Sequence, residues 1–292
     1  MLTAFALLML STGGLPPIDS STSLLVVSPH PDDETLCCAG AIRRVLDAGG
    51  RVSVVWLTSG DGSELSMLIV EKSLLKPRDK VRELATKRMQ EARSATALLG
   101  VDRTQQFFLG YPDGGLTQLL TVNRTTPWHA RFTGETQVPY PDASFPGHPY
   151  TGESLERDFS ALLDRVHPTL ILAPSPKDSH PDHAASGLLT INALTRRGEL
   201  PKARYWIVHD GEGWPSPRGY VPGIPLNMPQ GIALAPFALT DAEVASKLQA
   251  VNAYHTQMQF MAPFLLAFVR TTELYCSAPL AKSAAGVFSP ID

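Results

Sequence analysis

A short apolar run, Leu24–Val27, is followed at once by the polar segment Ser28–Glu34, and this junction constrains the fold more than any other feature. An uninterrupted run of Leu and Val predicts a buried strand. The two prolines in the polar segment then prevent the strand from continuing. The junction therefore predicts that His30, Asp32 and Asp33 lie at the carboxyl end of a first strand, where open α/β sheets bind ligands.

A second junction of the same kind lies further along the chain. The strand-like run Leu170–Ala173 precedes the sequence His180-Pro181-Asp182-His183. Histidines with nearby carboxylates can ligate zinc and still leave one carboxylate free to act as a base. Helix-capping aspartates and surface histidines would explain either cluster alone. Two such clusters, each after a predicted strand, instead favour a metal site.

Strand-like and helix-like segments alternate along most of the chain. We expect helices and strands over these ranges: helix 36–46, strand 51–58, helix 80–99, strand 105–109, helix 154–166, strand 169–173, strand 205–208 and helix 241–257. This alternation predicts an α/β fold, Rossmann-like and doubly wound, with a mostly parallel sheet. The Pro/Gly-rich segments Thr117–Tyr150 and Gly211–Gly231 lack a sustained period, and we expect them to be long loops around the active site that determine specificity.

The composition limits the classes of partner. The 292 residues are 43% hydrophobic and 18% charged, which allows a sizeable core, and the net charge of -3 provides no electrostatic basis for binding nucleic acid. A small-molecule substrate is therefore expected. Adjacent Cys37 and Cys38 are poor candidates for bonding to each other, so we expect buried thiols.

The first 23 residues form an apolar segment and linker, separate from a single domain expected over residues 24–292. Met1–Leu10 is too short to span a bilayer, so no stable membrane span is expected. It resembles the apolar part of a secretory signal, but no Lys or Arg precedes Arg43. We expect export to the periplasm if Met1–Gly14 is a signal segment, and a cytoplasmic protein otherwise. No pattern in the sequence indicates an oligomeric state.

The spacing within the two clusters suggests a role for each residue. His30 and Asp33 lie three residues apart on a tight turn, and both can face one ion. His183 would be the third ligand, which leaves the open position expected of catalytic zinc. Asp32 then lies beside the metal, where it can take a proton from water.

The remaining polar residues of the second cluster fit a role in stabilising charge. His180 opens the same predicted helix as His183 and can donate a hydrogen bond to a developing oxyanion. Either Asp182 or Asp178 could accept a hydrogen bond from its other ring nitrogen and keep it protonated.

Arg88 lies in the apolar stripe of its predicted helix, and a buried arginine is costly unless it is paired. Glu91, three residues later, would be a partner in an ion pair that holds the helix to the sheet. Asp113, in a Pro-Asp-Gly-Gly sequence, has the composition of an ordinary turn residue.

These motifs resemble those of the LmbE-like or PIG-L-like zinc-dependent de-N-acetylases. Further pieces that resemble the family occur in order between Leu24 and Gln257: Gly60-Asp61-Gly62 after Thr58, Arg88-Met89-Gln90-Glu91-Ala92, Leu99-Gly100, Gly110-Tyr111-Pro112-Asp113-Gly114-Gly115 and Tyr254-His255-Thr256-Gln257. The family often has His at the position of Tyr254, so we assign no role to this residue.

The resemblance implies hydrolysis of an N-acetyl group from an N-acetylglucosamine-containing or related N-acylated sugar conjugate. It implies one Zn²⁺ per chain, with another divalent ion as the alternative. The roles it implies are metal ligation by His30, Asp33 and His183, general base catalysis by Asp32, oxyanion stabilisation by His180, and substrate contacts by Arg88 and Asp113.

Two other functions compete with this interpretation. A zinc esterase or amidase could use the same site on another acylated small molecule, although the chain lacks both His-Glu-x-x-His and Gly-x-Ser-x-Gly. A non-catalytic sugar-binding protein on the same fold would be expected to lack a ligand or the base. Pro-His-Pro in place of a glycine fingerprint argues against a dinucleotide-binding protein.

Overall fold

A five-stranded parallel sheet in the order β3-β2-β1-β4-β5 forms the centre of the molecule. The computed structural model describes residues 13–63, 68, 77–211, 213–230 and 232–277. The strands are β1 (Ser23–Ser28), β2 (Arg51–Thr58), β3 (Gln106–Tyr111), β4 (Leu170–Pro174) and β5 (Ala203–Trp206). The main helices are α1 (Asp33–Asp47), α3 (Pro77–Leu98), α4 (Leu116–Thr121), α5 (Gly152–Val166), α6 (Pro181–Arg197), α7 (Asp241–Asn252) and α8 (His255–Leu265).

The strand order reverses direction at β1, and this reversal positions the site. Val26 in the middle of β1 pairs with Val54 of β2 on one side and with Leu172 of β4 on the other. The first half of the chain thus builds the sheet outward from β1 in one direction, and the second half builds it in the other. Loops that follow β1 and β4 meet at this switch point, which is where doubly wound sheets bind ligands.

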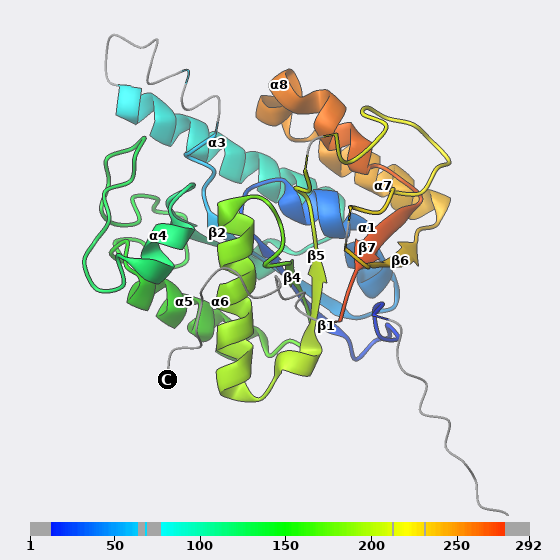
Figure 1. Ribbon diagram of the computed structural model, residues 1–292, viewed down its shortest axis with the longest axis horizontal. Coiled ribbons are helices and arrows are strands. Elements are labelled where there is room, and N and C mark those ends of the chain that lie inside the picture. Colours follow the sequence, from blue (N-terminus) through cyan, green and yellow to red (C-terminus); the bar gives the residue numbers. More distant parts are fainter. Residues whose placement is uncertain (1–12, 64–67, 69–76, 212, 231, 278–292) are drawn as a thin grey trace, which may run out of the picture.

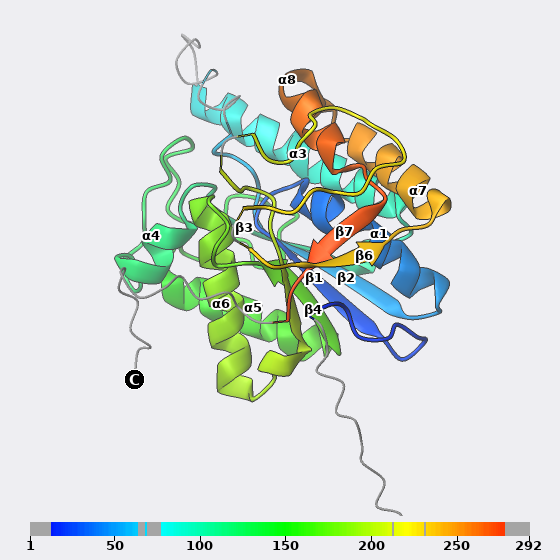
Figure 2. The ribbon, with the colours of Figure 1, turned by 45° about the vertical axis from the view of Figure 1, so that its right-hand side comes forward.

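Helices cover both faces of the sheet, which confirms the predicted α/β fold. Helices α1, α3 and α7 lie together on one face, whereas α5 and α6 lie on the other with α4 beside them (Figures 1 and 2). Helix α1 begins at Asp33, three residues earlier than predicted, so the second half of the first motif forms its first turn. Acidic side chains are stabilised at this end of a helix by its dipole.

The C-terminal part of the chain differs from the prediction. The expected helix over residues 241–257 is two helices, α7 and α8, because the chain leaves helical geometry at Tyr254 (φ -84°, ψ 65°). A two-stranded antiparallel sheet of β6 (Ala235–Ala238) and β7 (Thr272–Tyr275) was not predicted. Each of these strands has only four residues, too few to show a clear alternation.

The segment Thr117–Tyr150 packs into the core, although no regular pattern marks it in the sequence. Apart from α4, which begins one residue before it, the described segment is irregular, yet Val138, Tyr140 and Tyr150 are all buried. At Gly110 of β3 an added Cβ would lie 2.9 Å from Val138 and 3.2 Å from Tyr140, so the segment packs closely on this strand. It is thus a fixed cover on one edge of the sheet.

The prediction of two separate thiols at the start of α1 was wrong. The structure joins Cys37 and Cys38 by a disulfide, although adjacency had argued against this pairing. Both residues are buried, as predicted.

A buried ion pair ties the C-terminal elements to α1. Lys247 Nζ of α7 lies 2.9 Å from Glu273 Oε1 of β7 and donates to the carbonyl of Leu36 at 2.7 Å. Glu273 also accepts hydrogen bonds from the backbone N–H groups of Gly40 and Ala41, at 2.9 and 3.0 Å. Buried charges need such extra hydrogen bonds because desolvation opposes the pair.

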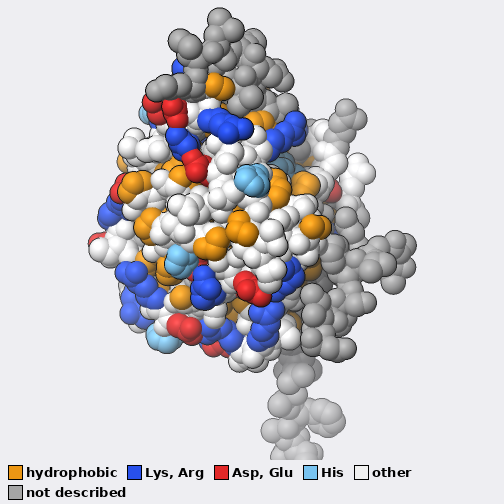
Figure 3. All heavy atoms as spheres, turned by 90° about the vertical axis from the view of Figure 1, so that its left-hand side faces the viewer, with side chains coloured by type: hydrophobic (Ala, Val, Ile, Leu, Met, Phe, Trp, Pro, Cys, Tyr) orange, Lys and Arg blue, Asp and Glu red, His pale blue; other side chains and the backbone are white. Residues whose placement is uncertain are grey.

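Within the described part of the chain, we find no helix with the length and apolar character needed to cross a membrane. Residues 1–12, most of the expected signal segment, lie outside the described residues. Basic, acidic and apolar side chains are interspersed on the face shown in Figure 3.

Candidate active site

The turn between β1 and α1 adopts an unusual backbone conformation at Asp32. Its φ of 136° lies in a region that favours glycine, and a non-glycine residue is held there only by its surroundings. The Asp32 carbonyl accepts hydrogen bonds from Thr35 and Leu36 of α1, at 2.9 and 3.0 Å. Across the same turn, the N–H of His30 donates to Asp33 Oδ2 at 3.0 Å and closes it.

Three donor atoms from the two predicted motifs meet at one point. Nδ1 of His30 lies 3.2 Å from Oδ2 of Asp33, and Nε2 of His183 lies 3.1 Å from the same oxygen. The two ring nitrogens are 3.3 Å apart. Ligands of tetrahedral zinc at bond lengths of about 2.0–2.1 Å are separated by about 3.3 Å. The donor set and its spacing therefore fit a zinc ion.

The charges around these rings also favour a cation. Burial opposes protonation of His183, but Asp178 and Asp33 raise its pKa to about 9. Burial likewise opposes protonation of His30, whose pKa the carboxylates of Asp113, Asp182 and Asp33 raise well above its usual value. The carboxylates therefore stabilise positive charge at this point, whether a proton or a metal ion supplies it.

Each candidate histidine ligand has a carboxylate next to its other ring nitrogen. His183 Nδ1 lies 3.1 Å from Asp178 Oδ2, and His30 Nε2 lies 3.3 Å from both Asp182 Oδ2 and Asp113 Oδ1. Metal-bound histidines usually donate their second N–H in this way, which fixes the tautomer and the ring orientation. The arrangement thus leaves His30 Nδ1 and His183 Nε2 to face the candidate metal position.

The expected contact between His180 and a carboxylate does not form in the structure. Asp182 lies in the first turn of α6, and its carboxylate accepts from the N–H groups of Gly114 (2.7 Å) and Leu116 (3.1 Å) after β3. Asp178 faces His183 instead. The ring of His180 accepts at Nδ1 from the backbone N–H of Asp182 at 3.2 Å, and its own backbone N–H donates to Asp178 Oδ1 at 2.9 Å. Both carboxylates therefore orient the other two histidines.

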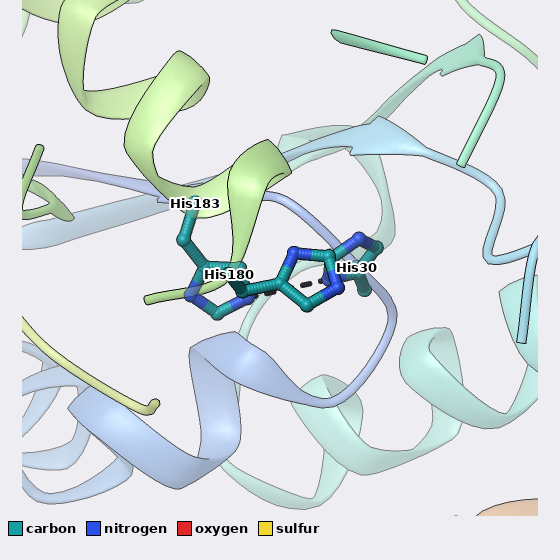
Figure 4. Close-up of side chains that lie close together, drawn as sticks. All are labelled: His30, His180 and His183. Carbon is teal, nitrogen blue, oxygen red and sulfur yellow. Dashed lines mark hydrogen bonds between the residues drawn. The ribbon is translucent and has the colours of Figure 1, made fainter. Parts of the chain in front are cut away.

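His180 nevertheless lies beside the candidate metal position. Its ring centroid is 4.8 Å from that of His30 and 5.1 Å from that of His183, and Figure 4 shows the three rings gathered at the start of α6. Burial, followed by the charges of His30 and His183, lowers the pKa of His180 to about 4. Because Nδ1 accepts from the backbone, the neutral ring carries its hydrogen on Nε2 and can donate it.

Adjacent Asp32 and Asp33 have opposite electrostatic environments. Burial, followed by the neighbouring charge of Asp33, raises the pKa of Asp32 to about 8, and Arg88 opposes this rise. Burial also disfavours ionised Asp33, but His183 and His30 outweigh it and lower its pKa well below the usual value. Carboxylates whose pKa values are pushed apart usually serve different functions.

Arg88 lies between Asp32 and Asp113 and not in the predicted pair with Glu91. Its guanidinium is 3.6 Å from Asp32 Oδ2 and 3.8 Å from Asp113 Oδ2, and it donates to the carbonyl of Gly60 at 2.7 Å. Glu91 instead accepts from Thr256 at the start of α8, where the hydroxyl donates at 2.6 Å. Arg88 is therefore buried among groups of the site.

Two residues of the site were missed in the sequence. Asp61, in the loop after β2, accepts from the N–H of Asp113 at 2.8 Å, and its position at a strand's carboxyl end was the available signal. His209 follows β5, and its ring centroid lies 4.7 Å from that of His183 and 5.2 Å from that of His180. Asp210 comes directly after it, so its position at the carboxyl end of the predicted strand 205–208 was again the available signal.

An apolar cavity adjoins Arg88 on the side of α3 and α8. It has a volume of about 70 Å³ and is lined by Ser63, Leu68, Leu84, Arg88, Thr256, Gln257, Phe260 and Met261.

Comparison with known proteins places these motifs in a family. The family model of PIG-L, described as GlcNAc-PI de-N-acetylase, matches residues 25–194. The chain is similar to the diacetylchitobiose deacetylase of Thermococcus kodakarensis, with 25% identity over 185 residues, 62% of this chain and 52% of that protein. The match thus spans about half of that relative. A 1D-myo-inositol 2-acetamido-2-deoxy-alpha-D-glucopyranoside deacetylase of Mycobacterium sp. (strain KMS) is 28% identical over 257 residues, 82% of this chain and 75% of that protein.

Solved structures share the fold. The conserved protein TT1542 from Thermus thermophilus aligns with a TM-score of 0.54 and 22% identity, covering 91% of this chain and all of that one. The N,N'-diacetylchitobiose deacetylase from Pyrococcus horikoshii aligns with a TM-score of 0.51 and 21% identity, covering 86% of this chain and 82% of that one. The family match covers more than half of the chain and includes both histidine motifs, and the chain therefore belongs to the PIG-L (LmbE-like) family of N-acetylglucosamine-related deacetylases.

Proposed function

We propose that the protein is a zinc-dependent hydrolase that removes the N-acetyl group from an N-acetylglucosamine-containing or related N-acylated sugar conjugate. One observation carries this proposal. His30, Asp33 and His183 present three donor atoms at zinc-ligand spacing, while the carboxylate of Asp32 and the ring of His180 remain beside them. The relatives whose printed names describe deacetylases of N-acetylated sugars support the choice of bond.

Each of the polar groups at the site would have its own role in the reaction. His30, Asp33 and His183 would hold the zinc, which supplies Lewis acidity when it is bound. Asp32 takes the proton from the attacking water and later delivers a proton to the leaving amine. His180 donates Nε2–H to the oxygen that gains negative charge when the water adds to the acetyl carbonyl.

Arg88 and Asp113 would hold the sugar next to this centre. The side chain of Asp113 is 9% exposed, and His30 and Arg88 lower its pKa although desolvation opposes this, so it stays ionised and can accept from sugar hydroxyls. Arg88 contributes N–H donors, and its positive charge lies between the carboxylates of Asp32 and Asp113 and reduces their mutual repulsion. The apolar cavity beside Arg88 supports a conjugate with a small apolar group next to the sugar.

Metal analysis and acetate release would test the proposal. Purified protein should contain one zinc per chain and should release acetate from at least one member of a panel of N-acetylglucosamine conjugates. The panel should include a matched sugar with an O-acetyl ester in place of the amide. Faster release from the ester would favour the esterase alternative, and zinc without release from any substrate would favour a binding protein. Asp32→Asn prepared in parallel controls for contaminating hydrolases.

A further inference from the structure

Two motif residues that have no role so far, Glu34 and Tyr254, contact each other beneath the Asp32 turn. Both side chains are fully buried. The Tyr254 hydroxyl donates to Glu34 Oε1, and Thr35 Oγ1 donates to the same oxygen at 3.0 Å. Tyr254 belongs to the connection between α7 and α8, so Glu34 links the first motif to the C-terminal motif.

The other carboxylate oxygen of Glu34 faces the strained turn. Oε2 accepts from Trp56 Nε1 at 2.8 Å, from Ser28 Oγ at 3.2 Å and from the backbone N–H of Asp32 at 3.2 Å. Asp32 precedes α1, so no helical carbonyl is available to its N–H. Glu34 therefore satisfies the one backbone donor of the residue whose φ is 136°.

We propose that Glu34 is a positioning residue that holds the Asp32 peptide in this conformation, with Trp56 and Tyr254 keeping the Glu34 carboxylate in place. Without the bond from Glu34, the Asp32 peptide would relax toward ordinary geometry, because only surrounding contacts keep a non-glycine residue at such a φ. Its carboxylate would then move relative to His30 and Asp33. The inference rests on the proposed function, in which Asp32 is the base.

The role is one of geometry, and the charge of Glu34 is not required for it. A glutamine has the same reach. Its oxygen can accept from Asp32 and Trp56, and its amide can donate to the hydroxyl oxygens of Tyr254 and Thr35, which can reverse their hydrogen bonds. An aspartate keeps the charge but is one methylene too short to reach the Asp32 N–H while it remains bonded to Tyr254.

The test compares Glu34→Gln, Glu34→Asp and Tyr254→Phe in the full chain. Glu34→Asp should lower kcat by about 10²-fold, the cost of a small misplacement of a catalytic group, with KM and zinc content near wild type. Glu34→Gln should retain most of kcat. Tyr254→Phe removes one of the hydrogen bonds that hold the Glu34 carboxylate but changes no residue of the Asp32 turn, so it should lower kcat only several-fold and preserve zinc. Glu243→Asp, at another buried glutamate in the capping box of α7, is the matched control and should leave kcat unchanged.

Hydrogen exchange at the Asp32 amide of the zinc-free protein gives a readout independent of turnover. It should be slow in wild type and in Glu34→Gln, and at least tenfold faster in Glu34→Asp. The inference is overturned if Glu34→Asp keeps its activity and slow exchange, if it loses zinc, or if Glu34→Gln is the inactive variant. If wild type releases no acetate from any substrate, the proposed function fails, and the exchange data alone decide whether Glu34 holds the turn.

Discussion

Replacing Asp182 with asparagine separates two roles for this residue. From the sequence, either Asp182 or Asp178 was expected to orient His180, whereas in the structure the Asp182 carboxylate faces His30. Oδ2 lies 3.3 Å from His30 Nε2 and accepts from the N–H of Gly114 at 2.7 Å, while Oδ1 accepts from Leu116 at 3.1 Å. All three neighbours are donors. An asparagine has one acceptor oxygen, so in either amide orientation its NH₂ group faces at least one N–H group.

The expected effect falls on metal affinity. Removing a carboxylate that orients a histidine ligand typically weakens metal binding about 10–100-fold, which corresponds to about 1.4–2.7 kcal/mol. Asp182 is fully buried, so solvent cannot replace the lost acceptor, and we expect the upper half of this range. At saturating zinc, kcat should stay within a few-fold of wild type, because the mutation leaves the Nδ1 contact of His180 to the backbone intact.

Competition with a chromophoric chelator would measure the zinc Kd, and acetate release at saturating zinc would measure kcat. Asp178→Asn is the matched comparison, since Asp178 faces His183 at 3.1 Å in the same way. If Asp182→Asn binds zinc as tightly as wild type and loses kcat, Asp182 acts on His180, and the assignment drawn from the structure is wrong.

Four further substitutions test other parts of the structure. Asp33→Ala should lose both zinc and activity, whereas Asp32→Asn should keep zinc and lower kcat about 10²–10⁴-fold. A zinc-free Asp32→Asn protein would contradict the assignment of Asp33 as the ligand and Asp32 as the base. Lys247→Met leaves the buried carboxylate of Glu273 without its partner and should destabilise the fold by about 3–5 kcal/mol. The midpoint of urea unfolding should therefore fall, and an unchanged midpoint would contradict this. Gly62→Ala would place a Cβ 2.7 Å from the Asp113 carbonyl oxygen and so displace Asp113. We expect KM to rise about tenfold with zinc content unchanged. An unaltered KM would show that Asp113 does not contact substrate.

The parts of the fold that could be predicted are those that depend on local pattern. The apolar runs of β1, β2 and β4 are long enough to identify as buried strands, and prolines mark where β1 and the loop before α6 end. The donor atoms of His30 and Asp33 meet because the two residues are three positions apart on a tight turn. Neither step needs knowledge of the rest of the chain.

Features that depend on distant packing could not be predicted in this way. The segment Thr117–Tyr150 is held by buried apolar side chains, among them Val138 and Tyr140. Because these side chains are irregularly spaced, the sequence has no periodicity from which their burial could be predicted. Arg88 could be identified as buried, but Glu91 was the wrong partner. Neighbours on the same helix are visible in the sequence, whereas Asp32 and Asp113 come to Arg88 from the connections after β1 and β3.

The same distinction implies that the candidate metal site could change in affinity while the residues of its two motifs stay the same. His30 and His183 come from loops after β1 and β4, neighbouring strands that meet because the sheet reverses its order there. The carboxylate of Asp182 is held by N–H groups of Gly114, in the loop after the edge strand β3, and of Leu116, where α4 begins after that loop. A change in that loop would move Asp182 and with it His30, so metal affinity can shift while every residue of the two motifs stays the same. Substrate contacts would shift as well, because Asp113 lies in that loop and faces the same ring nitrogen of His30.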